Sequence, residues 1–230
     1  MNCRFGEFVL SLALLAVGAS PARTQASDTS PPKLVVFITI DAMRPDYLPR
    51  FGTQLSGGLG RLYRGGAVFT NAFHDHAITE TAPGHSVTMS GRFPVHTGIS
   101  ANTAGVADST TTLLDAPGVG ASPFRFRGTT LTDWLIAKDA RTKVLSVSRK
   151  DRAAILPIGK SKQPVFWYSP IGIFTTSTYY ASSLPEWVKA FNARRLPASY
   201  AGRAWQPLLP DSAYSEPDSM SIESGGVGFV

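Results

Sequence analysis

The chain is nearly devoid of cysteine, because Cys3 is the only one among its 230 residues. Cys3 lies in a segment that we expect to be removed on export, so the mature protein would contain no cysteine and no disulfide bond. Catalysis by a thiol and metal sites built on cysteine are then excluded. Any chemistry must rest on hydroxyl, carboxylate, imidazole, amide and basic side chains.

The sequence also lacks an apolar run of the length that spans a bilayer, about 20 residues. Its first residues combine a charge at Arg4, an apolar stretch over 8–19 and small residues around Ala26. This order is typical of a secretory signal peptide. We expect a signal peptide over 1–26, a polar leader over 27–32 and a periplasmic or secreted domain over 33–230. An uncleaved N-terminal anchor is the alternative, whereas after cleavage we expect no stable membrane insertion.

Histidine is scarce and confined to one stretch, which contains His74, His76, His85 and His96. His74 and His76 flank the end of an expected strand, and nothing downstream completes a ligand set, so we expect no metal site there. The formal net charge is +6. This charge favours anionic substrates or simply reflects a solvated basic surface. Nucleic acid is not an expected partner, since no dense Lys/Arg stripe or binding motif occurs.

The most informative feature that is present is the apolar run Leu34–Ile40, which ends at Asp41. A short run that is apolar on both faces predicts a buried parallel strand. Ligands of open α/β sheets bind at the carboxyl ends of such strands. A carboxylate at that edge suits Zn²⁺ or another divalent ion. A turn or capping role for Asp41 is the alternative.

Thr81 precedes a stretch that we expect to be helical over 82–90, with Pro83 in the first turn. A helix N-cap would by itself explain a threonine at this position. Alternatively, its hydroxyl is a nucleophile that a base or a metal activates. A helix N-terminus also favours an incoming phosphate.

The remaining pattern predicts an α/β fold, in which a mostly parallel sheet is flanked by helices. Thr129 or Thr130 would cap a helix that ends near Lys138 and turns Leu131, Trp134 and Leu135 inward. A strand over 143–148 follows, and a helix before a strand is typical of a βαβ unit. Further expected elements are a weak helix over 51–62, a strand over 67–73, a surface excursion over 100–128 and a helix over 186–194.

Three polar side chains follow at positions where a phosphate could bind. Lys150 and Arg152 come directly after the strand over 143–148. In extended chain, side chains two residues apart point the same way. A guanidinium and an ammonium together match phosphate oxygens, although the Lys-Asp-Arg run could also be a solvated loop that neutralises itself. Asn102 lies in a turn-prone loop, and its amide could donate to a substrate oxygen.

In this order and spacing, five segments resemble the alkaline phosphatase superfamily, above all its secreted, threonine-nucleophile alkaline phosphatases. These enzymes are related to the type I phosphodiesterases and nucleotide pyrophosphatases. The segments are Ile38–Tyr47, Thr79–His85, Gly98–Asn102, Ser148–Pro157 and Phe174–Tyr180.

The resemblance implies a two-zinc enzyme that hydrolyses phosphate monoesters. Asp41 would ligate zinc, and Thr81 would be the zinc-bound nucleophile that is transiently phosphorylated. Asn102, Lys150 and Arg152 would hold the phosphoryl oxygens of small phosphate-ester substrates. In this family the Lys-x-Arg pair accompanies monoester hydrolysis.

The chain departs from the family after Arg152, where it has no histidine and only two aspartates, Asp211 and Asp218. The family completes its two-zinc site with later Asp and His motifs. We therefore expect the N-terminal part of a catalytic domain, with a fold incomplete at its C-terminal side and little activity in isolation. The alternatives are a phosphodiesterase or nucleotide pyrophosphatase, and a non-catalytic secreted fragment that binds phosphate or a partner.

Overall fold

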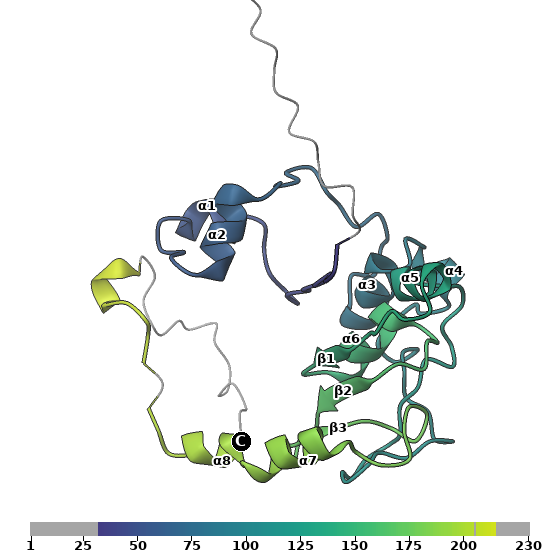
Figure 1. The fold of residues 1–230 in the computed structure, drawn as a ribbon. Coiled ribbons are helices and arrows are strands. Elements are labelled where there is room, and N and C mark those ends of the chain that lie inside the picture. Colours follow the sequence, from purple (N-terminus) through teal and green to yellow (C-terminus); the bar gives the residue numbers. More distant parts are fainter. Residues whose placement is uncertain (1–31, 205, 215–230) are drawn as a thin grey trace, which may run out of the picture. The chain divides into compact units, whose positions relative to one another are not determined.

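A computed structural model describes residues 32–204 and 206–214. The chain divides into two compact units, 1–45 and 46–230, whose positions relative to each other are not determined (Figure 1). The expected signal peptide over 1–26 lies outside the described residues, and it remains a prediction. Within the described ranges, no helix is both long and apolar enough to cross a bilayer.

In the first unit, the expected strand over 34–40 is wrong. Its backbone joins no sheet, and its side chains are exposed, with Leu34 at 78% and Ile38 at 69%. A strand is stabilised by hydrogen bonds to a neighbouring strand. None of the described strands pairs with this segment, so its apolar side chains remain uncovered.

The second unit begins with two short helices, α1 (Tyr47–Phe51) and α2 (Gly58–Gly65), where one weak helix over 51–62 was expected. Turns occupy the glycine-containing stretch between them, since glycine weakens a helix interior. The expected strand over 67–73 is also wrong. This stretch is irregular, and its aromatic side chains Phe69 and Phe73 are more than 80% exposed. It therefore lacks the buried face that would specify a strand.

The second unit contains a three-stranded sheet, with strand order β1-β2-β3. It comprises β1 (Ser146–Ser148), β2 (Val165–Tyr168) and β3 (Phe174–Thr175). β1 and β2 are parallel, whereas β3 is antiparallel to β2. The expected strand over 143–148 is confirmed in shortened form. The crossover between the parallel strands contains α6 (Asp151–Ile155) and the 3₁₀ helix η1 (Leu156–Ile158).

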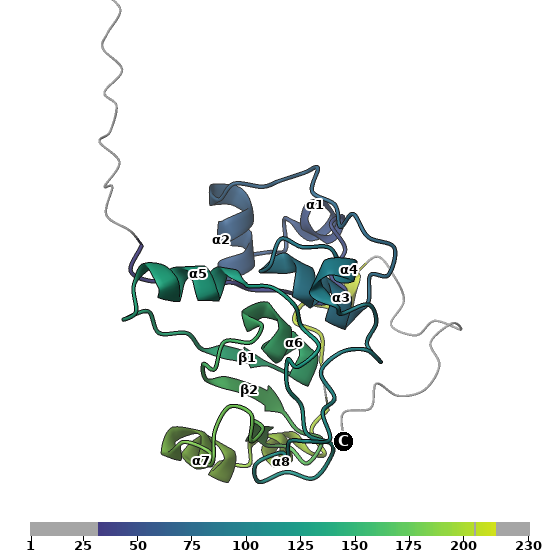
Figure 2. The same cartoon turned by 90° about the vertical axis from the view of Figure 1, so that its right-hand side faces the viewer.

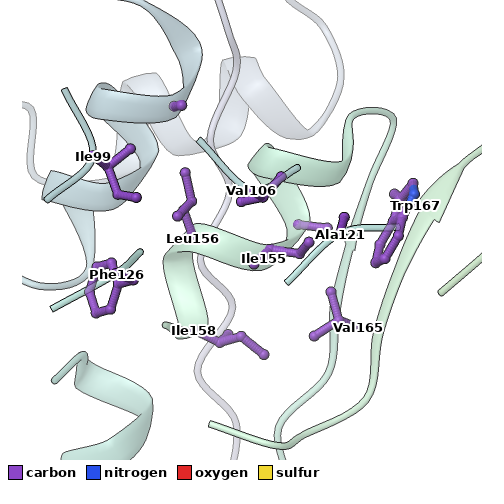
Figure 3. Packing of buried hydrophobic residues seen from close by; sticks show 11 residues of the cluster. Ile99, Val106, Ala121, Phe126, Ile155, Leu156, Ile158, Val165 and Trp167 are labelled. Carbon is purple, nitrogen blue, oxygen red and sulfur yellow. The ribbon is translucent and has the colours of Figure 1, made fainter. Parts of the chain in front are cut away.

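The sheet lies between α6 on one face and α7 (Glu186–Ala193) on the other (Figure 2). Successive residues of β2 point to opposite faces. Val165 and Trp167 join the main core with the α6 and η1 side chains, while Phe166 packs with Val188 of α7. Figure 3 shows Ile155, Leu156 and Ile158 in the middle of this main core. The helix expected over 186–194 is confirmed as α7.

The remaining helices of the described residues are α3 (Thr81–Thr88), α4 (Pro94–Thr97), α5 (Leu131–Lys138), α8 (Leu196–Tyr200) and the 3₁₀ helix η2 (Asp211–Ala213). A capping box between Thr130 and Asp133 starts α5, as the sequence predicts for Thr130. The inward orientation expected for Trp134 is wrong. Its side chain is 52% exposed, and its indole N–H donates to the Thr129 hydroxyl at 2.9 Å.

The segment over 100–128 is irregular but is not a surface excursion, because Val106, Ala121 and Phe126 belong to the main core. Its anchor is the buried carboxylate of Asp108. This carboxylate accepts hydrogen bonds from the hydroxyls of Ser122 and Thr110. These bonds hold the pKa of Asp108 below its ordinary value, against the opposing effect of burial. Polar residues can therefore fold inward here, because they bond to one another.

Candidate active site

The candidate nucleophile, Thr81, is the first residue of α3 and not its N-cap. The N-cap is Glu80, which has an extended backbone, and no side-chain capping bond forms there. The expected capping role of Thr81 is therefore wrong by one position. The residue is only 9% exposed. Its hydroxyl therefore lies in the first turn of the helix and not at the capping position.

Lys150 lies next to Thr81 in space although 69 residues separate them in sequence. The Lys150 ammonium donates a long hydrogen bond of 3.5 Å to the Thr81 hydroxyl. Lys150 is the N-cap residue of α6, and α6 packs against α3. The folding of the β1–α6 crossover onto α3 thus brings a cation to the candidate nucleophile.

Asn102 lies in an exposed bend and is bonded to both chain neighbours of Thr81. Its side-chain carbonyl accepts the Ala82 backbone N–H at 2.9 Å. Its own backbone N–H donates to the Glu80 carboxylate at 2.6 Å. The structure therefore brings Thr81, Asn102 and Lys150 together, as the sequence predicts for one site.

From the sequence, we expected Lys150 and Arg152 to lie in extended chain with their side chains pointing the same way. This expectation is wrong, because Arg152 lies within α6. One guanidinium nitrogen is 3.4 Å from the Asp151 carboxylate, and the side chain is 28% exposed. Its Nε atom is buried and lacks a hydrogen-bond partner among the described residues. A buried donor without a partner costs about 1–3 kcal/mol, so an incoming oxygen ligand would be favoured at this atom.

Asp41 follows the 34–40 segment in a turn and is exposed. It belongs to the first unit, so its distance from Thr81 is not defined. Across the described ranges, no group of three or more His, Cys, Asp or Glu side chains is arranged to hold a metal ion. Asp41 and Thr81 are oxygen donors of a suitable kind, but zinc takes about four ligands. The described residues therefore do not make up a zinc site.

Two residues of this site were not predicted from the sequence. His85 is buried, and its Nδ1 atom lies 2.8 Å from the Thr81 carbonyl oxygen. A histidine four residues after Thr81 on one helix was the available signal, since such residues share a face. Glu80 is the other residue, and its bond to Asn102 joins positions 22 residues apart. Such a contact has no local sequence signature.

Comparisons with known proteins show which family the chain belongs to. Residues 35–213 match the model of the type I phosphodiesterase/nucleotide pyrophosphatase family. The chain is 34% identical to alkaline phosphatase PafA of Elizabethkingia meningoseptica, over 94% of this chain and 42% of that protein. It is 38% identical to alkaline phosphatase PhoV of Synechococcus elongatus, over 90% of this chain and 42% of that protein.

The crystal structure of wild-type PafA confirms the α/β fold class. It superposes with a TM-score of 0.72 at 35% identity, covering 79% of this chain and 38% of that chain. The present chain thus spans about two fifths of the length of these relatives. The family match shows that the chain, which is also similar to the alkaline phosphatases PafA and PhoV, belongs to the type I phosphodiesterase/nucleotide pyrophosphatase family.

Proposed function

We propose that the protein hydrolyses phosphate monoesters and that Thr81 is its nucleophile. The observation that carries this proposal is the contact between the Lys150 ammonium and the Thr81 hydroxyl. It joins a hydroxyl and a cation at the start of a helix, where backbone N–H groups favour an anion. The similarity to PafA and PhoV, both named alkaline phosphatases, supports the same reaction.

In the proposed reaction, the Thr81 oxygen attacks the phosphorus atom and forms a new P–O bond. The ester P–O bond breaks, and the alcohol leaves with a proton. Water then hydrolyses the phosphothreonine, which releases phosphate and restores the Thr81 hydroxyl. A threonine hydroxyl needs activation. Asp41 and Thr81 would hold zinc together with ligands from elsewhere in the protein, and bound zinc lowers the pKa of a coordinated hydroxyl.

Asn102, Lys150 and Arg152 would bind the phosphoryl oxygens. The Asn102 carbonyl is engaged by Ala82, so its amide nitrogen is the group that would donate to the substrate. Lys150 would offset negative charge beside the nucleophile, and Arg152 has a buried Nε donor without a partner in the described chain. A terminal phosphoryl group carries more charge than a diester, so this pair of cations favours monoesters.

The monoester preference can be tested in a zinc-loaded version of the protein that is extended to the full length of its relatives. Lys150→Ala and Arg152→Ala should each lower turnover of p-nitrophenyl phosphate much more than turnover of a bis(p-nitrophenyl) diester. Lys138→Ala, at an exposed position of α5, is the matched control and should change neither. Equal losses on both substrates would contradict the assigned preference.

Phosphodiester or nucleotide hydrolysis is the second candidate, because the matching family model is named for it. The same substrate pair decides between the two. If the unsubstituted full-length protein turns over the diester faster than the monoester, the phosphodiesterase assignment replaces ours.

For the 230-residue chain alone, we propose little or no phosphatase activity, since its described residues hold no metal-binding group of three or more. Robust release of phosphate from p-nitrophenyl phosphate with added Zn²⁺ would overturn this. Phosphate binding without zinc, measured by calorimetry, would instead favour a non-catalytic binding fragment. We also propose export to the periplasm or medium, which N-terminal sequencing of the exported protein would test by a start just after Ala26.

A further inference from the structure

Glu80 stands out at the start of α3, because a carboxylate beside a phosphate site repels the substrate. Its side chain is exposed, yet one oxygen accepts the Asn102 backbone N–H at only 2.6 Å. A bond of this kind to an ionised acceptor is roughly twice as strong as a neutral one. One oxygen of the carboxylate is therefore engaged by the protein backbone.

The two bonds of Asn102 form a bracket around the nucleophile. Glu80 precedes Thr81 and accepts from the Asn102 backbone. Ala82 follows Thr81, and its backbone N–H donates to the Asn102 side-chain carbonyl. Each chain neighbour of Thr81 is thus joined to the same residue, once through its backbone and once through its side chain.

This bracket restricts the direction of the Asn102 amide. The Asn102 backbone is bonded to Glu80 and its side-chain carbonyl oxygen to Ala82, so rotation of the amide group relative to Thr81 is limited. We infer that Glu80 is a positioning residue, which acts through Asn102 to aim a hydrogen-bond donor at the phosphoryl group. The inference rests on the proposed function for the role of Asn102, but the bracket itself does not.

The bracket can be tested in the 230-residue chain by amide hydrogen exchange. Removing the acceptor in Glu80→Ala should speed exchange of the Asn102 amide hydrogen by about 10-fold, the equivalent of one lost charge-assisted bond. Glu80→Gln keeps an acceptor oxygen and should retain most of the protection. Glu186→Ala is the matched control, because Glu186 is an exposed carboxylate that pairs with Lys189. Unchanged exchange of Asn102 in Glu80→Ala would overturn the inference.

The consequence for catalysis can be tested in the zinc-loaded, full-length protein with a double-mutant cycle. We expect Glu80→Ala to lower kcat/KM for p-nitrophenyl phosphate about 10-fold, and Glu80→Gln to recover most of it. In the Asn102→Ala background, Glu80→Ala should cause no further loss, since no amide remains to be aimed. An equal loss in both backgrounds would show that Glu80 does not act through Asn102.

The same cycle separates failure of this inference from failure of the proposed function. If Asn102→Ala alone leaves turnover unchanged, Asn102 does not bind the phosphoryl group and its role in the proposed function is wrong. If Asn102→Ala lowers turnover but Glu80→Ala does not, the proposed function stands and the positioning role of Glu80 is overturned.

Discussion

Two helices of the second unit, α3 and α5, have a threonine at or directly before their first residue, and the two threonines have different roles. Thr130 is the N-cap of α5, and it forms a reciprocal capping box with Asp133. Thr81 is one position further along, as the first residue of α3, with Glu80 as the N-cap and no capping side chain. Both residues are buried. A shift of a single position thus separates a threonine that closes a helix from one whose hydroxyl meets a lysine.

The difference shows that the role of a threonine hydroxyl near a helix start cannot be predicted from the residue type alone. An N-cap hydroxyl turns back to satisfy backbone N–H groups that have no partner within the helix. At Thr81 the hydroxyl accepts a hydrogen bond from Lys150 instead. The start of α5 is thus closed by its own side chains, whereas at the start of α3 the Ala82 backbone N–H is bonded to Asn102, a residue distant in sequence.

The largest expected effect is the loss of phosphatase activity when Thr81, but not Thr130, is replaced by alanine. In the zinc-loaded, full-length protein, Thr81→Ala should lower phosphate release by about 10³-fold or more, as expected for removal of a nucleophile. Thr130→Ala should leave turnover within about threefold of the unsubstituted protein, when assayed well below its unfolding temperature, because a cap affects stability and not chemistry. Full activity of Thr81→Ala would show that Thr81 is not the nucleophile.

The next effect concerns the segment over 100–128, which lies between α4 and α5 in the chain. Asp108→Ala should lower the free energy of unfolding by about 1–3 kcal/mol at pH 7, because the hydroxyls of Ser122 and Thr110 lose a buried acceptor. The folded protein lowers the pKa of Asp108. Its stabilising contribution is therefore present above the ordinary aspartate pKa and is lost as the pH falls through the lowered value.

Urea unfolding at pH 7 and at pH 3 measures this dependence. The difference in stability between the unsubstituted protein and Asp108→Asn should shrink at the lower pH. Asp75→Asn is the matched control at an exposed carboxylate. A difference that stays constant between the two pH values would show that the Asp108 anion does not anchor the segment.

The smallest expected effect is the contribution of each hydroxyl to stability. The difference between Ser and Ala variants isolates the hydroxyl, because both remove the threonine methyl group. At position 130 this difference should be about 1 kcal/mol, as for other helix caps. At position 81 we expect less than half of that. Urea unfolding of the four variants gives both values, and equal values would mean that Thr81 also acts as a cap.

The sequence predicted which residues lie near Thr81 better than it predicted the sheet. The proximity of Thr81, Asn102 and Lys150 was implied by their family motifs, and the fold places all three together. Local signals also located α5 and α7, because caps and helical periodicity depend on near neighbours. The strand expected over 143–148 ends where β1 ends. The capping position of Thr81 was wrong by one residue, since Ser, Thr and acidic residues at a helix start compete for the same place.

The features that the sequence did not predict depend on residues that are distant in sequence. Leu34–Ile40 has the composition of a central strand, yet no described strand pairs with it. In contrast, β2 is short and lies in a stretch punctuated by proline and glycine, but it is buried on both faces between α6 and α7. Strand formation follows from pairing and burial more than from composition. The Asp108 anchor and the Glu80 bracket likewise join residues that are distant in sequence.

The central claim is that Thr81 is the nucleophile, and phosphoryl transfer to its side chain tests this most directly. The zinc-loaded, full-length protein would be mixed with a phosphate monoester, quenched in acid and digested for mass spectrometry. We predict a phosphoryl group on Thr81 that disappears when the substrate is exhausted and is absent in Thr81→Ala. Rapid turnover with no phosphoryl group on Thr81, or with one on another residue, would contradict the account.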